Sequence, residues 1–437
     1  RVLSEGAERF NEEYDLAVAF LEGGSAYYVA DHVRAKKKAA FIHIDYEKAG
    51  YSRNLDRDCY LGFDAVFPIG ENVKNKFLGV YPECRNRTFL FPNVVNQEEI
   101  RKKARAKMKG CYVCPDCDGN ACSGMIPGYG GMRTGQSFRN NRLSFQKYGL
   151  LSHLLSASKN PDTTCSIFGK TLSMPILIAP VSGYVHNGKI EGNPEEKEYE
   201  YLFSMTEGAA KAGTLVFTGD SGHAYMYEAG IAASKKYPKH VIPTIKPRKN
   251  QKIIEKARLA EQSDAFAVAN DVDAVTSANM RFFGQPLEVE RLKNLKYIIS
   301  SIHLPFIVKG IMSPDEALLC LEAGAKGIVI SNHGGRILDG MASPLSVLPE
   351  ISAVVKNRLT IFIDGGIRHG EDVLKALALG ADAVLIGRPA AIANIGGYAE
   401  GVTLLLDTLK QELQDAMTIT GIPDLQHISS NILQKIK

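Results

Sequence analysis

The sequence predicts an α/β protein whose larger part is a (β/α)8 TIM barrel, preceded by a Cys/Gly-rich segment and a partial Rossmann-like α/β unit. Eight compact apolar runs follow one another between residues 174 and 389, with helix-length segments between most of them. The segment 315–331 also aligns with the segment 371–387, so one helix–strand pattern occurs twice. An open doubly wound sheet is the alternative, because a pattern of elements does not prove that the sheet closes.

The eight apolar runs are interpreted as buried parallel strands, because they are short and rich in β-branched and aliphatic residues. They are MPILIAPV (174–181), TLVFTG (214–219), HVIPTI (240–245), AFAVAND (265–271), PFIVKGI (305–311), GIVISNHG (327–334), IFIDGGI (361–367) and AVLIGRP (383–389). Helix signals lie between them. One such helix has Ser313 as its N-cap and Pro314 in its first turn.

Composition limits the classes of protein to which this chain can belong. Its 437 residues suffice for a barrel of about 250 residues plus further material. A hydrophobic content of 45% with 23% charged residues is typical of soluble proteins, and no apolar run reaches the length of about 18 residues that spans a membrane. The net charge of +4 favours neither a nucleic-acid nor a membrane partner. The first residues lack a signal-peptide layout, so a cytoplasmic location is expected.

The first hundred residues show a looser α/β alternation. The strand candidates are YDLAVAF (14–20), AAFIHID (39–45), FDAVFPI (63–69) and RTFLF (87–91). Together with DLAVAFLEG, FIHIDYEKAGY and FPNVV, they resemble part of the nucleotide-sugar glycosyltransferases with two Rossmann-like domains. The resemblance implies a truncated or fused remnant over residues 1–104. A charged, helix-prone segment then leads into a linker and Cys-rich segment at 105–141, and the barrel is expected over 142–437.

Half of the eight cysteines lie in one short segment, and the others are isolated. The four that lie together are Cys111, Cys114, Cys117 and Cys122. Their spacing is close to the ferredoxin run, although the fourth cysteine comes one residue late and no proline follows it. Four thiolates could hold an iron–sulfur cluster or zinc, and the alternative is a set of reduced thiols in a Gly-rich flap.

Charged and polar residues follow the ends of the apolar runs. They include Asp271, Lys309, His333, Arg336, Asp364, Arg368 and Arg388. Any one of them alone is more often structural, but the carboxyl ends of barrel strands meet on one rim, so the set predicts a site there. The last two runs continue into DGGIRHG and IGRP, where glycine N–H groups and arginines suit a phosphate.

The motifs IVKGI, SNHGGR-x-LD, DGGIR-x-G-x-DV-x-KALALGA and IGRP, in this order, resemble the FMN-dependent α-hydroxy acid oxidase and dehydrogenase family, which includes glycolate and lactate oxidases. The similarity covers Arg142 to Ile432. It implies a TIM barrel, an FMN cofactor and oxidation of a small L-2-hydroxy acid to the 2-oxo acid. It also implies a homo-oligomer, commonly a tetramer, and an electron acceptor that is either oxygen or a redox protein.

The resemblance carries roles to individual residues. His333 matches the active-site base and Arg336 the residue that holds the substrate carboxylate. Asp271 matches the aspartate that orients the histidine, with Asp273 as the alternative. Lys309 matches the lysine beside the flavin N1 and C2 carbonyl. The cofactor-binding matches are Lys309, Pro180, Val181, Ser182, Ser331, Asp364, Gly365, Gly366, Arg368, Gly387 and Arg388.

Some positions depart from the family pattern. Glycolate-type enzymes carry a tyrosine after the third strand, where this chain reads HVIPTIKPRKN. Tyr129 is the candidate for the N-terminal substrate tyrosine, and Arg281 for a second substrate arginine. Two alternatives therefore stay open. One is an FMN barrel of another class, such as a type 2 isopentenyl diphosphate isomerase, and the other is a flavin electron-transfer or redox module that uses the cysteine cluster.

Overall fold

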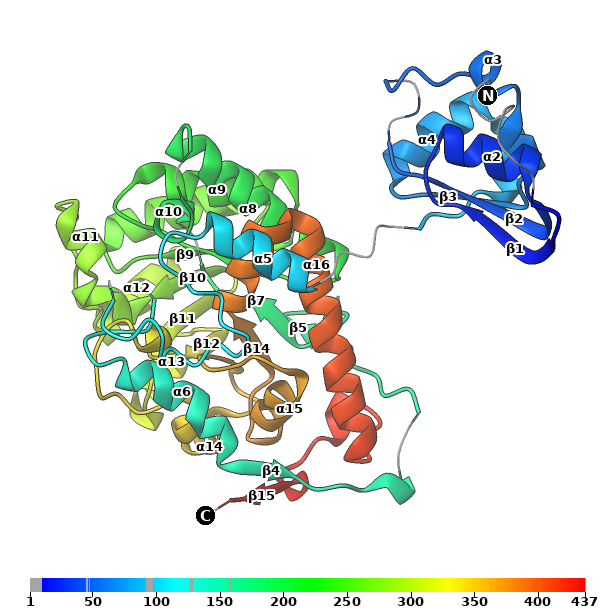
Figure 1. The fold of residues 1–437 in the computed structure, drawn as a ribbon. Helices are drawn as coiled ribbons and strands as arrows, with labels where there is room; N and C mark the ends of the chain where they lie inside the picture. Colours follow the sequence, from blue (N-terminus) through cyan, green and yellow to red (C-terminus); the bar gives the residue numbers. More distant parts are fainter. Residues whose placement is uncertain are drawn as a thin grey trace. The chain divides into compact units, whose positions relative to one another are not determined.

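The computed structural model describes residues 10–44, 46, 48–91, 97–125, 129–156, 159–181, 183–189 and 191–436. The chain forms two compact units, residues 1–94 and residues 95–437 (Figure 1). In the described part of the chain, no helix is both long and apolar enough to cross a membrane.

Eight parallel strands of the larger unit form a closed barrel. They are β7 (Ile176–Ile178), β8 (Val216–Thr218), β9 (Val241–Ile245), β10 (Val268–Asp271), β11 (Phe306–Ile311), β12 (Gly327–Ile330), β13 (Thr360–Asp364) and β14 (Ala383–Ile386). Strand β14 pairs with β7, with Leu385 opposite Leu177, and this pairing closes the ring. All eight predicted strands are confirmed, and the open-sheet alternative is wrong.

Helices surround the barrel (Figure 1). They are α8 (Pro194–Lys211), α9 (Ala224–Lys236), α10 (Asn250–Gln262), α12 (Leu292–Ser300), α13 (Pro314–Glu322), α14 (Pro344–Val355), α15 (Gly370–Ala378) and α16 (Arg388–Ile419), with the short α7 (Tyr184–Asn187) and α11 (Ala278–Phe282) in two of the loops. The predicted cap of α13 forms, since the Ser313 hydroxyl accepts from the N–H of Glu316.

Strand alternation divides the side chains between two apolar layers. Residues such as Leu177, Ile307 and Phe362 fill the barrel interior, while their neighbours, such as Val308 and Ile363, pack outward against the helices. The hairpin of β5 (Cys165–Ile167) and β6 (Lys170–Leu172) adds apolar side chains to the interior cluster. The interior is therefore a packed core, and polar groups are left to the strand ends.

Elements outside the ring complete the larger unit. Helix α5 (Gln97–Lys107) packs on α16, where Ile100 is buried against the helix surface. Helix α6 (Gln136–Gln146) precedes β4 (Tyr148–Leu150), which pairs with the C-terminal β15 (Leu433–Lys435). Between α5 and α6 the described residues form turns without a regular element, as the composition of this Cys/Gly-rich segment predicts.

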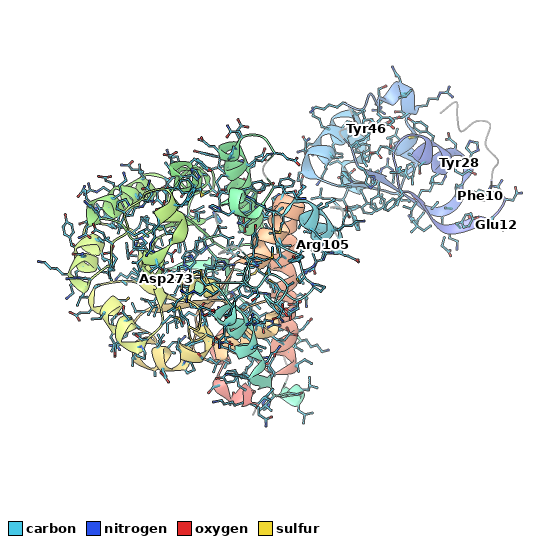
Figure 2. The ribbon with its side chains drawn as sticks, turned by 60° about the vertical axis from the view of Figure 1, so that its left-hand side comes forward. Phe10, Glu12, Tyr28, Tyr46, Arg105 and Asp273 are labelled. Atoms are coloured by element: carbon cyan, nitrogen blue, oxygen red, sulfur yellow. The ribbon has the colours of Figure 1, made fainter. Side chains whose placement is uncertain are left out.

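The smaller unit is a three-stranded parallel sheet with helices. Its elements are β1 (Glu13–Ala19), α2 (Gly24–His32), β2 (Arg34–Ile42), α3 (Arg53–Asp56), β3 (Ala65–Pro68) and α4 (Glu71–Val80). Its core includes buried Tyr46 (Figure 2). The predicted strand 87–91 is wrong as a regular element, because only Thr88 forms a β-bridge, with Val66.

Candidate active site at the carboxyl ends of the barrel strands

The barrel mouth gathers polar side chains because alternation turns them inward at the ends of the strands. Asp364 ends β13, two residues after the interior Phe362, and Lys309 on β11 follows the interior Ile307 at the same spacing. Lys246 directly follows β9, and Asp271 ends β10. The predicted convergence on one rim is therefore present for these groups.

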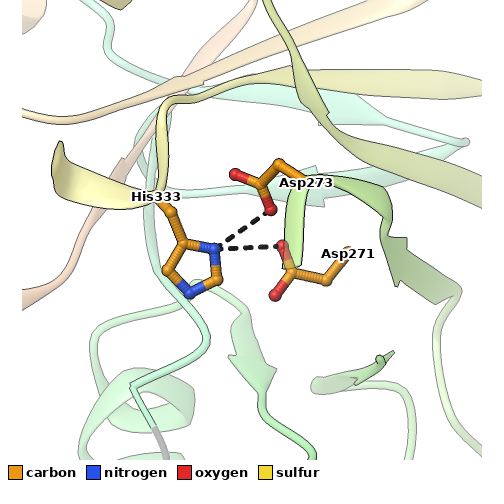
Figure 3. A group of neighbouring side chains, drawn as sticks. All are labelled: Asp271, Asp273 and His333. Atoms are coloured by element: carbon orange, nitrogen blue, oxygen red, sulfur yellow. Dashed lines mark hydrogen bonds and ion pairs between the residues drawn. The ribbon is translucent and has the colours of Figure 1, made fainter. Parts of the chain in front are cut away.

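His333 lies in the loop after β12 with its ring directed at two carboxylates (Figure 3). Its Nδ1 is 3.0 Å from Oδ1 of Asp273 and 3.5 Å from Oδ1 of Asp271. The backbone at His333 has a φ of 56°, a left-handed conformation that turns the ring out of the strand direction. Since Nδ1 faces both carboxylates, Nε2 is the ring nitrogen left to receive a proton.

Asp271 is held between two lysines. Its Oδ2 is 2.6 Å from Nζ of Lys246, and its Oδ1 is 3.0 Å from Nζ of Lys309. Burial by itself favours the neutral acid, but the two ammonium groups and His333 hold the pKa of Asp271 well below its usual range. Asp271 is therefore an ionised carboxylate shared by three partners.

Asp273 differs electrostatically from Asp271. Burial raises the pKa of Asp273, although Lys309 and His333 act in the opposite direction. The pKa of Lys309 is raised despite burial, chiefly by Asp271 and Asp273. Nδ1 of His333 is also closer to Asp273, at 3.0 Å, than to Asp271, at 3.5 Å. The geometry thus makes Asp273 the main partner of the His333 ring and Asp271 the main partner of the two lysines.

Three buried oxygen atoms at the mouth have no hydrogen-bond partner among the described residues. They are Oγ1 of Thr244, Oδ2 of Asp273 and Oδ1 of Asp364. Buried polar atoms are rarely left unsatisfied, so these atoms indicate a polar ligand in the mouth. Ser331 lies among them, with its Oγ 3.3 Å from Nζ of Lys309. This set of donors and acceptors suits the polar edge of a flavin.

The loop after β13 needs its glycines for packing. Gly366 has a φ of 92°, and a Cβ there would lie 2.1 Å from the backbone oxygen of Asn141 on α6. Gly365 has a φ of 101° and also lies against Asn141. These glycines were expected to let an anion approach the backbone. In the structure they let helix α6 pack closely against the loop.

Three arginines lie around the ring of Phe138 on α6. The guanidinium carbons of Arg336, Arg368 and Arg388 are 5.8, 5.9 and 5.2 Å from the ring centroid. Burial, together with the nearby charge of Arg388, lowers the pKa of Arg336 to about 9. Such a cluster of like charges favours an anion such as a phosphate or a carboxylate.

The other residues that were predicted to belong to the site differ in burial and in contacts. Pro180 and Val181 are half-buried after β7, and Gly387 precedes α16, while Ser182 lies outside the described residues. The Tyr129 hydroxyl donates to the carbonyl of His186 at 2.8 Å, and the side chain is buried. Arg281 is exposed on α11.

Two residues were missed from the sequence. Glu198 on α8 is buried and accepts from the N–H groups of Gly183 and Tyr184, at 2.7 and 2.5 Å, so it fixes the backbone after β7. Burial raises the pKa of Glu198 to about 7. Lys246 was the other, and the strand-end rule that selected Lys309 also selects it, since it directly follows a fully buried strand.

Among the described residues, no cysteine belongs to a group of three potential ligands that lie close enough together to hold one metal ion. Two groups of potential ligands come within mutual reach there, Asp271–Asp273–His333 and His369–Glu371–Glu412, and neither contains a cysteine. All eight cysteines are free thiols. The predicted iron–sulfur cluster or zinc thus stays a prediction.

The chain is similar to known proteins over the residues that form the barrel. The profile of the FMN-dependent dehydrogenases matches residues 128–282 and 194–435. A 2-hydroxyacid oxidase of Dictyostelium discoideum is 31% identical, over 67% of this chain and 81% of its own length. An L-lactate oxidase of Lacticaseibacillus rhamnosus is also 31% identical, over 67% of this chain and 84% of its own. The crystal structure of a mandelate oxidase superposes with a TM-score of 0.62 at 26% identity, covering 78% of this chain and 98% of that one.

The family profile begins at residue 128, and the resemblance of residues 1–104 to glycosyltransferases is not supported. The barrel, the strand-end lysine and the His-x-x-Arg loop lie inside the matched range. The chain belongs to the FMN-dependent dehydrogenase family.

Proposed function

We propose that this protein oxidises a small L-2-hydroxy acid to the 2-oxo acid with FMN as its cofactor. The observation that carries the proposal is His333, whose Nδ1 is held by Asp273 at 3.0 Å beside the buried Lys309. The relatives named 2-hydroxyacid oxidase and L-lactate oxidase support this chemistry over the isomerase and redox-module alternatives.

The residues present fit the cofactor at both of its ends. Lys309, Ser331 and Asp364 lie at the mouth where the flavin ring would be held, and the arginine cluster around Phe138 suits the phosphate. FMN, when bound, supplies the acceptor for the hydride equivalent. Because Lys309 remains cationic and buried, it stabilises negative charge in its surroundings.

His333 is assigned the proton transfer. Its Nε2 takes the hydroxyl proton, and the carboxylates at Nδ1 stabilise the imidazolium that results. Arg336 is three residues further along the same loop, with Nη1 3.3 Å from the carbonyl of His333. That spacing allows the guanidinium to hold the substrate carboxylate beside the base.

The first test is anaerobic reduction of the bound flavin by a panel of L-2-hydroxy acids that includes glycolate, lactate and mandelate. We expect at least one of them to bleach the flavin absorbance and to yield the matching 2-oxo acid. A protein that holds FMN and is bleached by no member of a broad panel would contradict the proposal. Reoxidation of the bleached protein by oxygen or by an artificial one-electron acceptor then distinguishes an oxidase from a dehydrogenase.

The two aspartates should be separable by substitution. In Asp273→Asn the partner of His333 loses its charge, so the rate of flavin reduction should fall by a factor on the order of 10² or more, with FMN still bound. Asp271→Asn removes the shared partner of two lysines, so it should mainly weaken FMN retention and folding stability.

Stopped-flow reduction and FMN content, measured on both variants, check this division. The opposite pattern, in which Asp271→Asn alone slows reduction and Asp273→Asn resembles the unmodified protein, would give the orienting role to Asp271.

A further inference from the structure

The four clustered cysteines lie in one turn-rich segment, residues 111–122, which we name the cysteine loop. Arginines of α5 bind its carbonyl oxygens from one side. Arg105 donates to the oxygens of Tyr112 and Val113 at 3.0 and 3.1 Å, and Arg101 donates to that of Cys114 (Figure 2 labels Arg105). Because α5 binds its carbonyl oxygens, the loop follows a defined path although it contains no helix or strand.

The backbone turns between successive cysteines as a ligand-binding loop does. Val113, between the first two cysteines, has a φ of 50°, and its N–H points at Sγ of Cys111, 3.4 Å away. Gly119, between the third and fourth, has a φ of 87°, and a Cβ there would lie 2.3 Å from the ring of Phe138. N–H groups directed at cysteine sulfur are among the contacts that tune iron–sulfur clusters.

The thiols are not grouped as closely as a single zinc ion requires. Among the described residues, no three cysteine sulfurs come within 4.8 Å of one another. Zn–S bonds of about 2.3 Å would place the sulfurs closer than this. A cluster that inserts iron and sulfide between the thiolates needs the wider spacing.

The cysteine loop also contacts the arginines at the barrel mouth. The carbonyl of Cys117 accepts from Nε and Nη2 of Arg368, at 3.1 and 2.8 Å. The guanidinium of Arg388, which donates to the carbonyl of Tyr129, lies with that of Arg368 against the ring of Phe138. An anionic cluster in the loop would therefore have cationic partners, and the loop backbone would be tied to the predicted phosphate site.

From the spacing, the turns and the cationic surroundings, we propose that the cysteine loop binds a [4Fe–4S] cluster through its four thiolates. This goes beyond the proposed function, because oxidation of a hydroxy acid by FMN requires no such cluster. It makes the larger unit a two-centre redox protein, with the cluster beside the phosphate end of the flavin site.

The test uses the full chain, purified without oxygen and with its FMN. We expect about four iron atoms and about four acid-labile sulfides per chain, and a paramagnetic signal after reduction by dithionite. Cys114→Ser should lose most of the iron and the signal, whereas Cys165→Ser, which changes a half-buried thiol outside the cysteine loop, should keep both. FMN content and circular dichroism check that each variant is folded.

Three outcomes would overturn the proposal. They are one zinc per chain without sulfide, iron retained by folded Cys114→Ser, and metal-free protein that takes up no iron on anaerobic reconstitution with ferrous iron and sulfide. If Cys114→Ser fails to fold, the iron and sulfide content of the unsubstituted protein and of Cys165→Ser still decides the question. Because these readouts are independent of turnover, they also stand if no hydroxy acid reduces the flavin.

Discussion

His333→Ala should slow reduction of the flavin by its best hydroxy acid substrate by a factor on the order of 10² to 10⁴, the usual contribution of a positioned general base. The variant keeps the Asp273 carboxylate and Lys309, but no group remains to take the hydroxyl proton. The backbone at residue 333 is left-handed, with a φ of 56°, a conformation that alanine adopts less readily than histidine, so circular dichroism is used to check that the variant is folded. Anaerobic stopped-flow absorbance of the bound flavin measures the rate directly.

His240→Ala is the matched control, because His240 immediately precedes β9, at the opposite end of that strand from the mouth. Both variants should retain FMN, since neither histidine belongs to the arginine cluster or contacts Lys309. A His333→Ala protein whose flavin is reduced within tenfold of the unmodified rate would show that the base is another group.

The barrel could be predicted because its strands are buried on both faces and therefore appear as short, uninterrupted apolar runs. The site followed from a single geometric rule, that the carboxyl ends of the strands meet at one rim. Lys309, Asp271 and His333 satisfy that rule, and the structure brings them within hydrogen-bonding range of one another or of shared partners. Lys246 satisfies it equally well, so the same rule also predicts this lysine at the site.

Contacts between distant segments could not be predicted in this way. The choice between Asp271 and Asp273 depends on a 3-10 turn that begins at Val272, where strand alternation stops. The need for Gly366 depends on Asn141, far away in the sequence, and the role of Glu198 depends on two backbone N–H groups after β7. In each case the deciding partner lies on another element, and no local pattern records it.

Lys309→Met should lower the free energy of unfolding of the larger unit by about 3–5 kcal/mol, because it takes a buried cation away from Asp271 and Asp364 and leaves Lys246 as the one ammonium group beside Asp271. Nζ of Lys309 is 3.0 Å from Asp271 and 3.9 Å from Asp364, and its side chain is 2% exposed. Lys246→Met is the matched comparison. It removes the other ammonium group from Asp271, but the Lys246 side chain is 14% exposed, so water can partly replace it and the loss should be smaller.

The chain has no tryptophan, so urea unfolding is best followed by far-ultraviolet circular dichroism and by release of FMN. The double variant Lys309→Met/Asp271→Asn distinguishes charge from packing. If the cost arises from an uncompensated carboxylate, removing that carboxylate should recover part of the stability that Lys309→Met loses. If the double variant is instead less stable than Lys309→Met by the full cost of Asp271→Asn, the two changes are independent, and Lys309 acts through its packed stem rather than its charge.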